Sequence, residues 1–198
     1  ERLDHLVTLG VNTIQLMPVA EFPGRWSWGY DAIAPFAPAR SYGSPDDLRT
    51  FVDAAHSRGL AVVLDVVYNH LGLAGDILAL FSKRYFRPAR ACPGGRTFNF
   101  DGDDARHVRN FFVQNALYWL DEFRLDGLRL DATHCVEDTS AQHIFAEIAA
   151  AVQARGGFVI ADDERNDARV LGPREAGGLG RGCGAGGRFP SQPARGAH

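Results

Sequence analysis

The chain has 198 residues, of which 45% are hydrophobic and 11% aromatic, and it carries a formal net charge of −3. This composition excludes a disordered tail and a collagen-like fibre, and the length allows one domain. The weak negative charge gives no electrostatic reason to expect a nucleic-acid or membrane surface as a partner. No run approaches the roughly 20 apolar residues of a membrane-spanning helix.

Three cysteines, Cys92, Cys135 and Cys183, are an odd number without a regular spacing. They indicate neither a disulfide framework nor a zinc site, and the first residues do not read as a signal peptide. We therefore expect the chain to work in a reducing cytoplasm.

The chain opens on an expected helix and strand. Leu3, Leu6 and Val7 recur at helical spacing before Gly10, which ends the helix. The apolar run 13–19 then predicts a buried strand. Because the first segment is already periodic, we expect the chain to begin inside a domain.

A second helix and strand follow over residues 44–58 and 60–67. Ser44 can cap the helix, and Pro45 suits its first position. The strand is apolar except for Asp65, a pattern typical of a parallel sheet that helices cover on both faces.

Residues 70–105 show little periodicity, which predicts a loop-rich stretch. Helices are expected over 106–123 and 139–155, each followed by a short strand, at 125–130 and 158–161. Four strands that alternate with helices indicate a parallel α/β sheet with right-handed crossovers. Both α/β barrels and open α/β sheets place their sites at the carboxyl ends of such strands.

Charged side chains gather at these strand ends. Asp65 lies in the end of one strand, and His70 lies in the loop beyond it. Arg129 and Asp131 are two positions apart, so both point to the same face, where the guanidinium keeps the carboxylate ionised, as a nucleophile requires. With Asp162 after the next strand, two carboxylates stand on neighbouring strand ends. Glycoside hydrolysis needs such a pair, and a separation of about 5–5.5 Å gives retention of configuration.

Each of these residues also has an ordinary structural interpretation. An isolated Asp at a strand end is usually a loop cap or the partner of a nearby Arg. His70 and His134 could be hydrogen-bonding loop residues. His56 reads as a helix-surface residue, and Trp26 and Trp28 as packing aromatics. The functional interpretation depends on the joint occurrence of charged residues at consecutive strand ends.

Two stretches, 65–70 and 127–134, resemble the first two signature regions of the α-amylase superfamily of glycoside hydrolases, and Trp-Gly-Tyr-Asp at 28–31 resembles the segment after its second barrel strand. Within the superfamily, other stretches are similar to the malto-oligosyltrehalose trehalohydrolase family. These stretches are 16–24, 99–102, 115–122, 131–134 and 163–167. The resemblance covers roughly residues 1–180.

The resemblance implies a partial (β/α)8 TIM barrel with about four βα units, its strands two to five. It implies a hydrolase that cleaves the α-1,4 bond joining trehalose to a maltooligosaccharide. By position, Asp131 matches the nucleophile, Arg129 its charge partner and Asp162 the general acid. The resemblance assigns the substrate-binding or supporting residues as Tyr30, Asp65, His70 and His134. No cofactor or metal is implied, because two carboxylates suffice for the reaction and no oxygen-rich loop suggests calcium.

The chain departs from the family at the general acid, where Asp162 replaces Glu. The shorter side chain would misplace the proton, and such misplacement can cost about 10²-fold in rate. The loop 91–96 also departs from the family, and the family's third catalytic carboxylate follows a later strand than this chain contains. We therefore expect an incomplete catalytic domain over residues 1–180, with 70–105 as an insertion.

The last residues break the pattern. Residues 172–198 hold nine glycines and only two large apolar side chains, Leu179 and Phe189, which predicts a disordered tail over 181–198. Only Lys83 among the 21 basic residues is lysine, which suggests GC-rich DNA. Our hypothesis is that this tail is such DNA translated out of frame.

Three alternatives stay open. A 1,4-α-glucan branching enzyme would use the same nucleophile for glycosyl transfer. A non-catalytic glucan-binding remnant would keep Tyr30, His70 and His134 without turnover. A nucleotide-binding α/β protein would need a glycine-rich phosphate loop after a strand, and no strand here is followed by one. The oligomeric state cannot be read from the sequence.

Overall fold

The computed structural model describes residues 2–72, 74, 77–92, 95–165 and 172. The predicted end of the catalytic unit at residue 180 lies outside the described residues, as does the predicted disordered or out-of-frame tail over 181–198. The side chains of residues 91–95, in the loop that departs from the family pattern, also lie outside the described residues.

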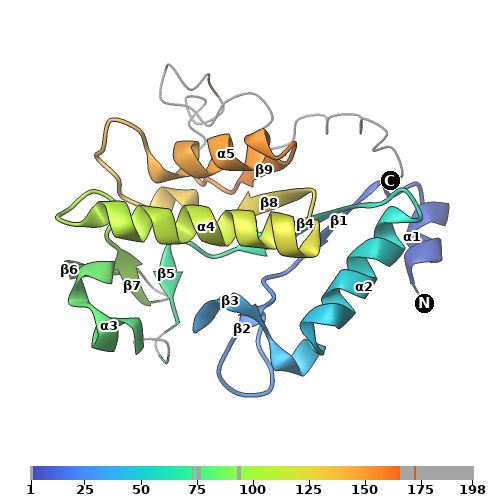
Figure 1. Cartoon of the computed structure of the whole chain (residues 1–198), viewed down its shortest axis with the longest axis horizontal. Coiled ribbons are helices and arrows are strands. Elements are labelled where there is room, and N and C mark those ends of the chain that lie inside the picture. Colours follow the sequence, from blue (N-terminus) through green and yellow to red (C-terminus); the bar gives the residue numbers. More distant parts are fainter. Residues whose placement is uncertain (1, 73, 75–76, 93–94, 166–171, 173–198) are drawn as a thin grey trace.

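A four-stranded parallel sheet forms the centre of the molecule (Figure 1). Its strands are β1 (Thr13–Leu16), β4 (Ala61–Val66), β8 (Gly127–Leu130) and β9 (Phe158–Ala161), in the order β1-β4-β8-β9. All three pairings are parallel, so the predicted alternation of strands and helices is confirmed. All six residues of β4 are buried, as expected for a strand that is covered on both faces.

One helix precedes these strands and three connect them. They are α1 (Leu3–Thr8), α2 (Pro45–His56), α4 (Ala105–Phe123) and α5 (Ile144–Ala154). The predicted start of α2 is confirmed, because the Ser44 side chain and Asp47 form a reciprocal capping box. Figure 1 shows α4 and α5 running alongside one another next to β8 and β9.

The predicted start of the third long helix at residue 139 is wrong, since α5 begins at Ile144. The Asp138 side chain accepts hydrogen bonds from the backbone N–H groups of Ser140 and Ile144, at 2.9 and 2.6 Å. These bonds hold the segment before α5 as a loop, and His143 caps the helix through the N–H of Phe145. Local side-chain acceptors thus outcompete helical bonds there.

Two small antiparallel sheets were missed by the sequence analysis. One pairs β2 (Ala20–Glu21) with β3 (Ala34–Pro38). The other has the order β5-β7-β6, from the strands His70–Leu71, Gly95–Phe98 and Phe86–Cys92. With the short helix α3 (Ile77–Phe81), it lies at the opposite end of the molecule from α1 (Figure 1). The expectation of a loop-rich 70–105 is therefore wrong in this respect. Single 3₁₀ turns occur at Arg40–Tyr42, Lys83–Tyr85 and Thr133–Cys135.

Aromatic packing joins the small sheet to the main core. Phe98 of β7 and Phe112 of α4 meet edge to face with ring centroids 4.4 Å apart, and Tyr68 packs on Phe112 at 5.0 Å. The predicted inward face of α4 is confirmed, because each of its members is buried. They are Val108, Phe112, Ala116, Trp119, Leu120 and Phe123. The same hydrophobic cluster therefore supports both the barrel strands and the loops at their carboxyl ends.

Candidate active site

Charged side chains from three strand ends meet around Arg129. We call Arg129, Asp65, Asp131, Asp162 and the side chains bonded to them the Arg129 cluster. The register of β4 and β8 pairs Asp65 with Arg129, and Asp131 follows two positions later. Arg129 Nη1 lies 2.6 Å from Asp65 Oδ2 and 2.8 Å from Asp131 Oδ1, while Nη2 lies 2.6 Å from Asp162 Oδ2. Burial alone would lower the pKa of Arg129, but its carboxylate partners raise it above its usual value. One guanidinium thus brings together three of the carboxylates that the sequence analysis singled out.

Asp131 is held at both carboxylate oxygens. Oδ1 accepts from Arg129, and Oδ2 accepts from the Asn69 amide at 3.1 Å. The same amide also donates to the Asp131 backbone carbonyl at 3.0 Å. Asn69 was not predicted as a site residue, although it lies within residues 65–70. Asp131 is therefore a fixed, partly exposed carboxylate at a strand end, which is what a nucleophile requires.

Tyr30 and Asp65 form the floor of this cluster. The Tyr30 hydroxyl donates to Asp65 Oδ2 at 2.8 Å, and Asp65 is 1% exposed. Burial and the bond to Asp65 raise the pKa of Tyr30 to about 12, so Tyr30 stays a neutral donor. Burial also raises the pKa of Asp65, although the bonds from Arg129 and Tyr30 counteract it. Oδ1 of Asp65 has no hydrogen-bond partner among the described residues.

The position of Tyr30 depends on Gly29. Gly29 has φ +90°, and a Cβ there would lie 2.2 Å from the backbone oxygen of Pro18. Only glycine accommodates both the left-handed backbone and this close approach. The glycine of the Trp-Gly-Tyr-Asp stretch therefore fixes the direction in which Tyr30 enters the site.

Asp162 and Asp163 have different surroundings. Asp162 is half-exposed, and apart from Arg129 it accepts from the N–H of Ala132 at 3.3 Å. Asp163 accepts from the Thr133 hydroxyl at 2.9 Å and pairs with Arg165 at 2.5 Å. The bond from Arg165 holds the pKa of Asp163 far below its usual value, and so Asp163 stays ionised. Asp163 therefore cannot serve as a proton donor.

The two predicted histidines lie in different places. His70 begins β5, and its ring contacts Asn69 Oδ1 through Nδ1 and lies 2.9 Å from the Tyr30 carbonyl through Nε2. The structure therefore places His70 in the Arg129 cluster through Asn69 and Tyr30. His134 contacts Glu164 instead, with Nε2 3.6 Å from Oε2, in the 3₁₀ turn after β8.

Three aromatic or histidine interpretations are wrong. Trp26 and Trp28 are 85% and 78% exposed and do not pack in the core. His56 is not a free surface residue, because its Nε2 lies 2.8 Å from Asp126 Oδ2, and the same oxygen accepts from the N–H of Val62 at 2.7 Å. This pair lies at the amino ends of the strands, where it supports the sheet rather than the site.

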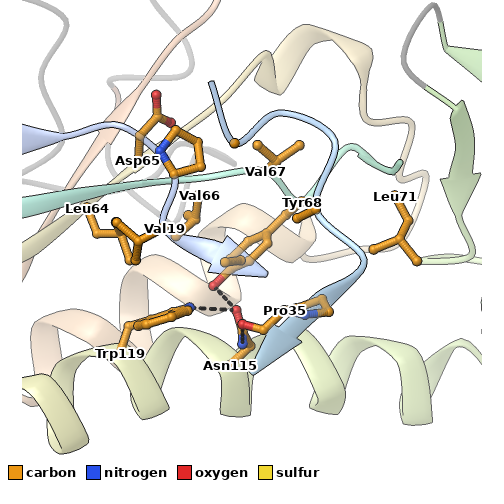
Figure 2. A pocket seen from close by; sticks show the side chains of 14 residues that line it. Val19, Pro35, Leu64, Asp65, Val66, Val67, Tyr68, Leu71, Asn115 and Trp119 are labelled. Carbon is orange, nitrogen blue, oxygen red and sulfur yellow. Dashed lines mark hydrogen bonds between the residues drawn. The ribbon is translucent and has the colours of Figure 1, made fainter. Parts of the chain in front are cut away.

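A cavity beneath the cluster is structural (Figure 2). Within it, Asn115 Oδ1 accepts from the Tyr68 hydroxyl at 2.7 Å and from the Trp119 indole at 3.2 Å. Its amide donates to the Pro35 carbonyl at 2.8 Å. Figure 2 shows the Asp65 carboxylate pointing away from this group. The side-chain polar groups of Tyr68, Asn115 and Trp119 are thus satisfied within the cavity, and the candidate catalytic carboxylates lie on the other side of Asp65.

Over the described ranges, no group of three or more His, Cys, Asp or Glu side chains is placed to hold a metal ion. No helix in that part of the chain has the length and apolar character needed to cross a membrane.

Known proteins that resemble this chain bear α-amylase, trehalohydrolase and branching-enzyme names. The α-amylase catalytic-domain family matches residues 1–86. Malto-oligosyltrehalose trehalohydrolase of Saccharolobus solfataricus is 45% identical over 88% of this chain and 31% of its own length. The enzyme of that name from Arthrobacter ramosus is 44% identical over 90% of this chain and 32% of its own. The 1,4-α-glucan branching enzyme of Thiobacillus denitrificans is 38% identical over 91% of this chain and 28% of its own.

Solved structures show the same fold. A Salmonella typhimurium protein assigned as an α-amylase has 42% identity and a TM-score of 0.79, over 87% of this chain and 30% of that one. An Anoxybacillus α-amylase has 22% identity and a TM-score of 0.76, and shows the fold alone. The chain spans about a third of the length of the curated relatives that it matches. Its similarity thus lies with α-amylases and related enzymes, and its four parallel strands and their loops resemble part of an α-amylase catalytic barrel.

Proposed function

We propose that the chain is part of a retaining glycoside hydrolase that releases trehalose from maltooligosyl trehalose. The observation that carries the proposal is the Arg129 cluster, in which Asp131 and Asp162 bond to the two Nη atoms of one guanidinium. Both carboxylates thus lie beside one guanidinium, and a separation of about 5–5.5 Å between them would favour retention over inversion, which needs a wider gap for water. The relatives at 40–45% identity bear the trehalohydrolase name.

In the proposed reaction, a carboxylate oxygen of Asp131 attacks the anomeric carbon of the glucosyl unit next to trehalose. The bond from that carbon to the glycosidic oxygen breaks, and Asp162 gives its proton to the departing oxygen. Water then attacks the glycosyl ester, returns its proton to Asp162 and releases the maltooligosaccharide. Arg129 and Asn69 hold Asp131 throughout, and Tyr30, His70 and His134 contact the reacting sugar.

The proposal extends to organisation and location. We infer that residues 1–180 form one catalytic-type unit in which the small sheet of 70–105 is an insertion. We also infer a cytoplasmic location, supported by three cysteines that indicate no disulfide framework. A maltooligosyl trehalose or another α-glucan is the proposed partner.

Two other functions have specific support. The identity to a branching enzyme favours glycosyl transfer, which would use the same nucleophile. The ion pair between Asp162 and Arg129 favours a non-catalytic glucan-binding remnant, since Oδ2 of the proposed acid is already bonded to the guanidinium.

A full-length chimaera tests these functions. In it, residues 11–165 replace the matching stretch of the Arthrobacter ramosus enzyme, which supplies the rest of the barrel. The chimaera is incubated with maltooligosyl trehalose and separately with amylose. Released trehalose supports the proposal, and new α-1,6 branches support the branching enzyme. Binding of maltooligosaccharide without either product supports the remnant.

A further inference from the structure

The side chains around Asp131 form a closed circuit of hydrogen bonds. From Asp131 it passes through Arg129 to Asp65 and then to the Tyr30 hydroxyl. The Tyr30 carbonyl contacts His70 Nε2, and His70 Nδ1 contacts Asn69. The Asn69 amide returns to Asp131. The circuit joins residues of β4 and β8 to the loop that holds Tyr30, and Asn69 closes it.

The orientation of the Asn69 amide follows from its neighbours. Its NH2 group faces two acceptors, the carbonyl oxygen and Oδ2 of Asp131, at 3.0 and 3.1 Å. Its carbonyl oxygen therefore faces Nδ1 of the His70 ring. Asn69 is 2% exposed, so water cannot substitute for either contact.

Arg129 alone does not fix the Asp131 carboxylate. The torsion that turns a carboxylate about its Cβ–Cγ bond has a broad, shallow profile. The single bond from Arg129 Nη1 to Oδ1 leaves Oδ2 free to swing about that axis. A second donor at Oδ2 removes this freedom, and Asn69 is that donor.

We infer that Asn69 is a positioning residue, which holds the Asp131 carboxylate in its attacking orientation and couples that orientation to His70. This inference rests on the proposed function, in which Asp131 is the nucleophile. A buried amide that served packing alone would bond only to backbone or core groups. Asn99 is such a residue, because its amide donates to the carbonyls of Arg84 and Asp103.

The test compares Asn69→Asp with Asn99→Asp in the full-length chimaera. Both variants keep the shape of the side chain and lose one NH2 donor, but only Asn69→Asp places a carboxylate against Asp131. We expect Asn69→Asp to lower kcat about 10²-fold while KM changes by less than about threefold. A like charge beside Asp131 disfavours its ionised form, so the acid limb of the kcat/KM profile moves to higher pH. Asn99→Asp should change neither kcat nor the acid limb.

A second measurement reads Asp131 directly. A fluorinated glucosyl fluoride, which traps the glycosyl ester, is added to each chimaera, and the rate of labelling at Asp131 is followed by mass spectrometry. Labelling should slow about 10²-fold in Asn69→Asp and in Asn69→Ser, which serves if the first variant does not fold. Equal labelling rates in the Asn69 and Asn99 variants would overturn the inference.

These readouts separate two failures. If the parent chimaera labels at Asp131 but releases no trehalose, the proposed function fails, while the labelling rates still decide the role of Asn69. If the folded parent is not labelled at Asp131, the nucleophile assignment and the inference about Asn69 are both overturned.

Discussion

Arg129 Nη2 lies 2.6 Å from Oδ2 of Asp162, the residue that we propose as the general acid. An acid must carry a proton when the reaction starts, whereas one oxygen of Asp162 is bonded to the guanidinium. We predict that Asp162→Glu in the full-length chimaera raises turnover of maltooligosyl trehalose about 10²-fold. The extra methylene carries the carboxyl group past Arg129 toward the glycosidic oxygen.

An activated aryl glycoside provides the control for this substitution. Its leaving group needs little protonation, so the gain from Asp162→Glu should be small. Equal gains on both substrates, or a larger loss from Glu164→Gln than from Asp162→Ala, would show that the acid is misassigned.

Asp131→Asn should abolish nearly all turnover and leave binding intact. The amide cannot form the glycosyl ester, but it keeps the shape that Arg129 and Asn69 surround. Calorimetric titration with a maltooligosaccharide and a trehalose assay measure the two properties. Near-normal turnover in this variant would remove Asp131 from the mechanism.

Gly29→Ala should disturb the site through Tyr30. An alanine held in the left-handed backbone conformation costs about 1–2 kcal/mol, and its Cβ would also lie 2.2 Å from the Pro18 oxygen. Gly24 is the matched control, because its φ is +87° but nothing lies within 4 Å of its Cβ position. We expect Gly29→Ala to lower the thermal midpoint more than Gly24→Ala and to raise KM, whereas Gly24→Ala leaves KM unchanged. Equal effects would contradict the role given to the Pro18 contact.

The loop between β8 and α5 should weaken in acid. The Asp138 side chain has no exposed surface and pairs with Arg109 at 2.7 Å. Burial opposes its charge, but bonds from Ser140, Arg109 and Ile144 lower the pKa of Asp138 below its ordinary 3.8. Such a group contributes stability that is complete above its unfolded pKa and is lost as the pH falls through its folded pKa.

Asp138→Asn should therefore lower the free energy of unfolding by about 3 kcal/mol at pH 7, and by less at pH 3. The exposed pair Asp53–Arg124 is the control, and Asp53→Asn should cost less than about 1 kcal/mol. Unfolding midpoints at both pH values measure these effects. If Asp138→Asn lowers the free energy of unfolding by the same amount at both pH values, the proposed link between Asp138 ionisation and stability is contradicted.

The 198-residue chain expressed alone should not form a stable monomer. Within the described residues, β1 pairs only with β4 and β9 only with β8, so each has an open edge. Open edges of this kind invite pairing between chains. We expect self-association, a broad urea transition and no trehalose release. A sharp urea transition in a monomer, measured alongside sedimentation, would contradict this prediction.

The sequence predicted the parallel sheet because β4 and β8 are apolar runs with helical segments between them. It missed β2 and β5 because strands of two residues carry no periodicity. The start of α5 was misplaced because Asp138 captures backbone N–H groups that a helix would otherwise use. Side-chain acceptors of this kind leave no mark in a pattern of apolar spacing.

Part of the candidate site could be predicted from the sequence for a different reason. Arg129 and Asp131 share a face by spacing alone, and the strand order then brings Asp65 beside them. Asn69 could not be singled out, because an Asn in a loop has many structural uses and its contact with Asp131 depends on how β4 and β8 pair. The pairing of His56 with Asp126 was hidden similarly, since the two residues are 70 positions apart.

Four bonds of the Arg129 cluster span long stretches of chain, with partners 35, 40, 62 and 64 positions apart. None of them can form until the parallel strands have paired, and non-local pairing is slow because loop closure must come first. The helices, whose bonds are local, can form earlier. During refolding, the site should thus appear in the last kinetic phase, together with the sheet, so that labelling of Asp131 would report the completion of folding rather than its beginning.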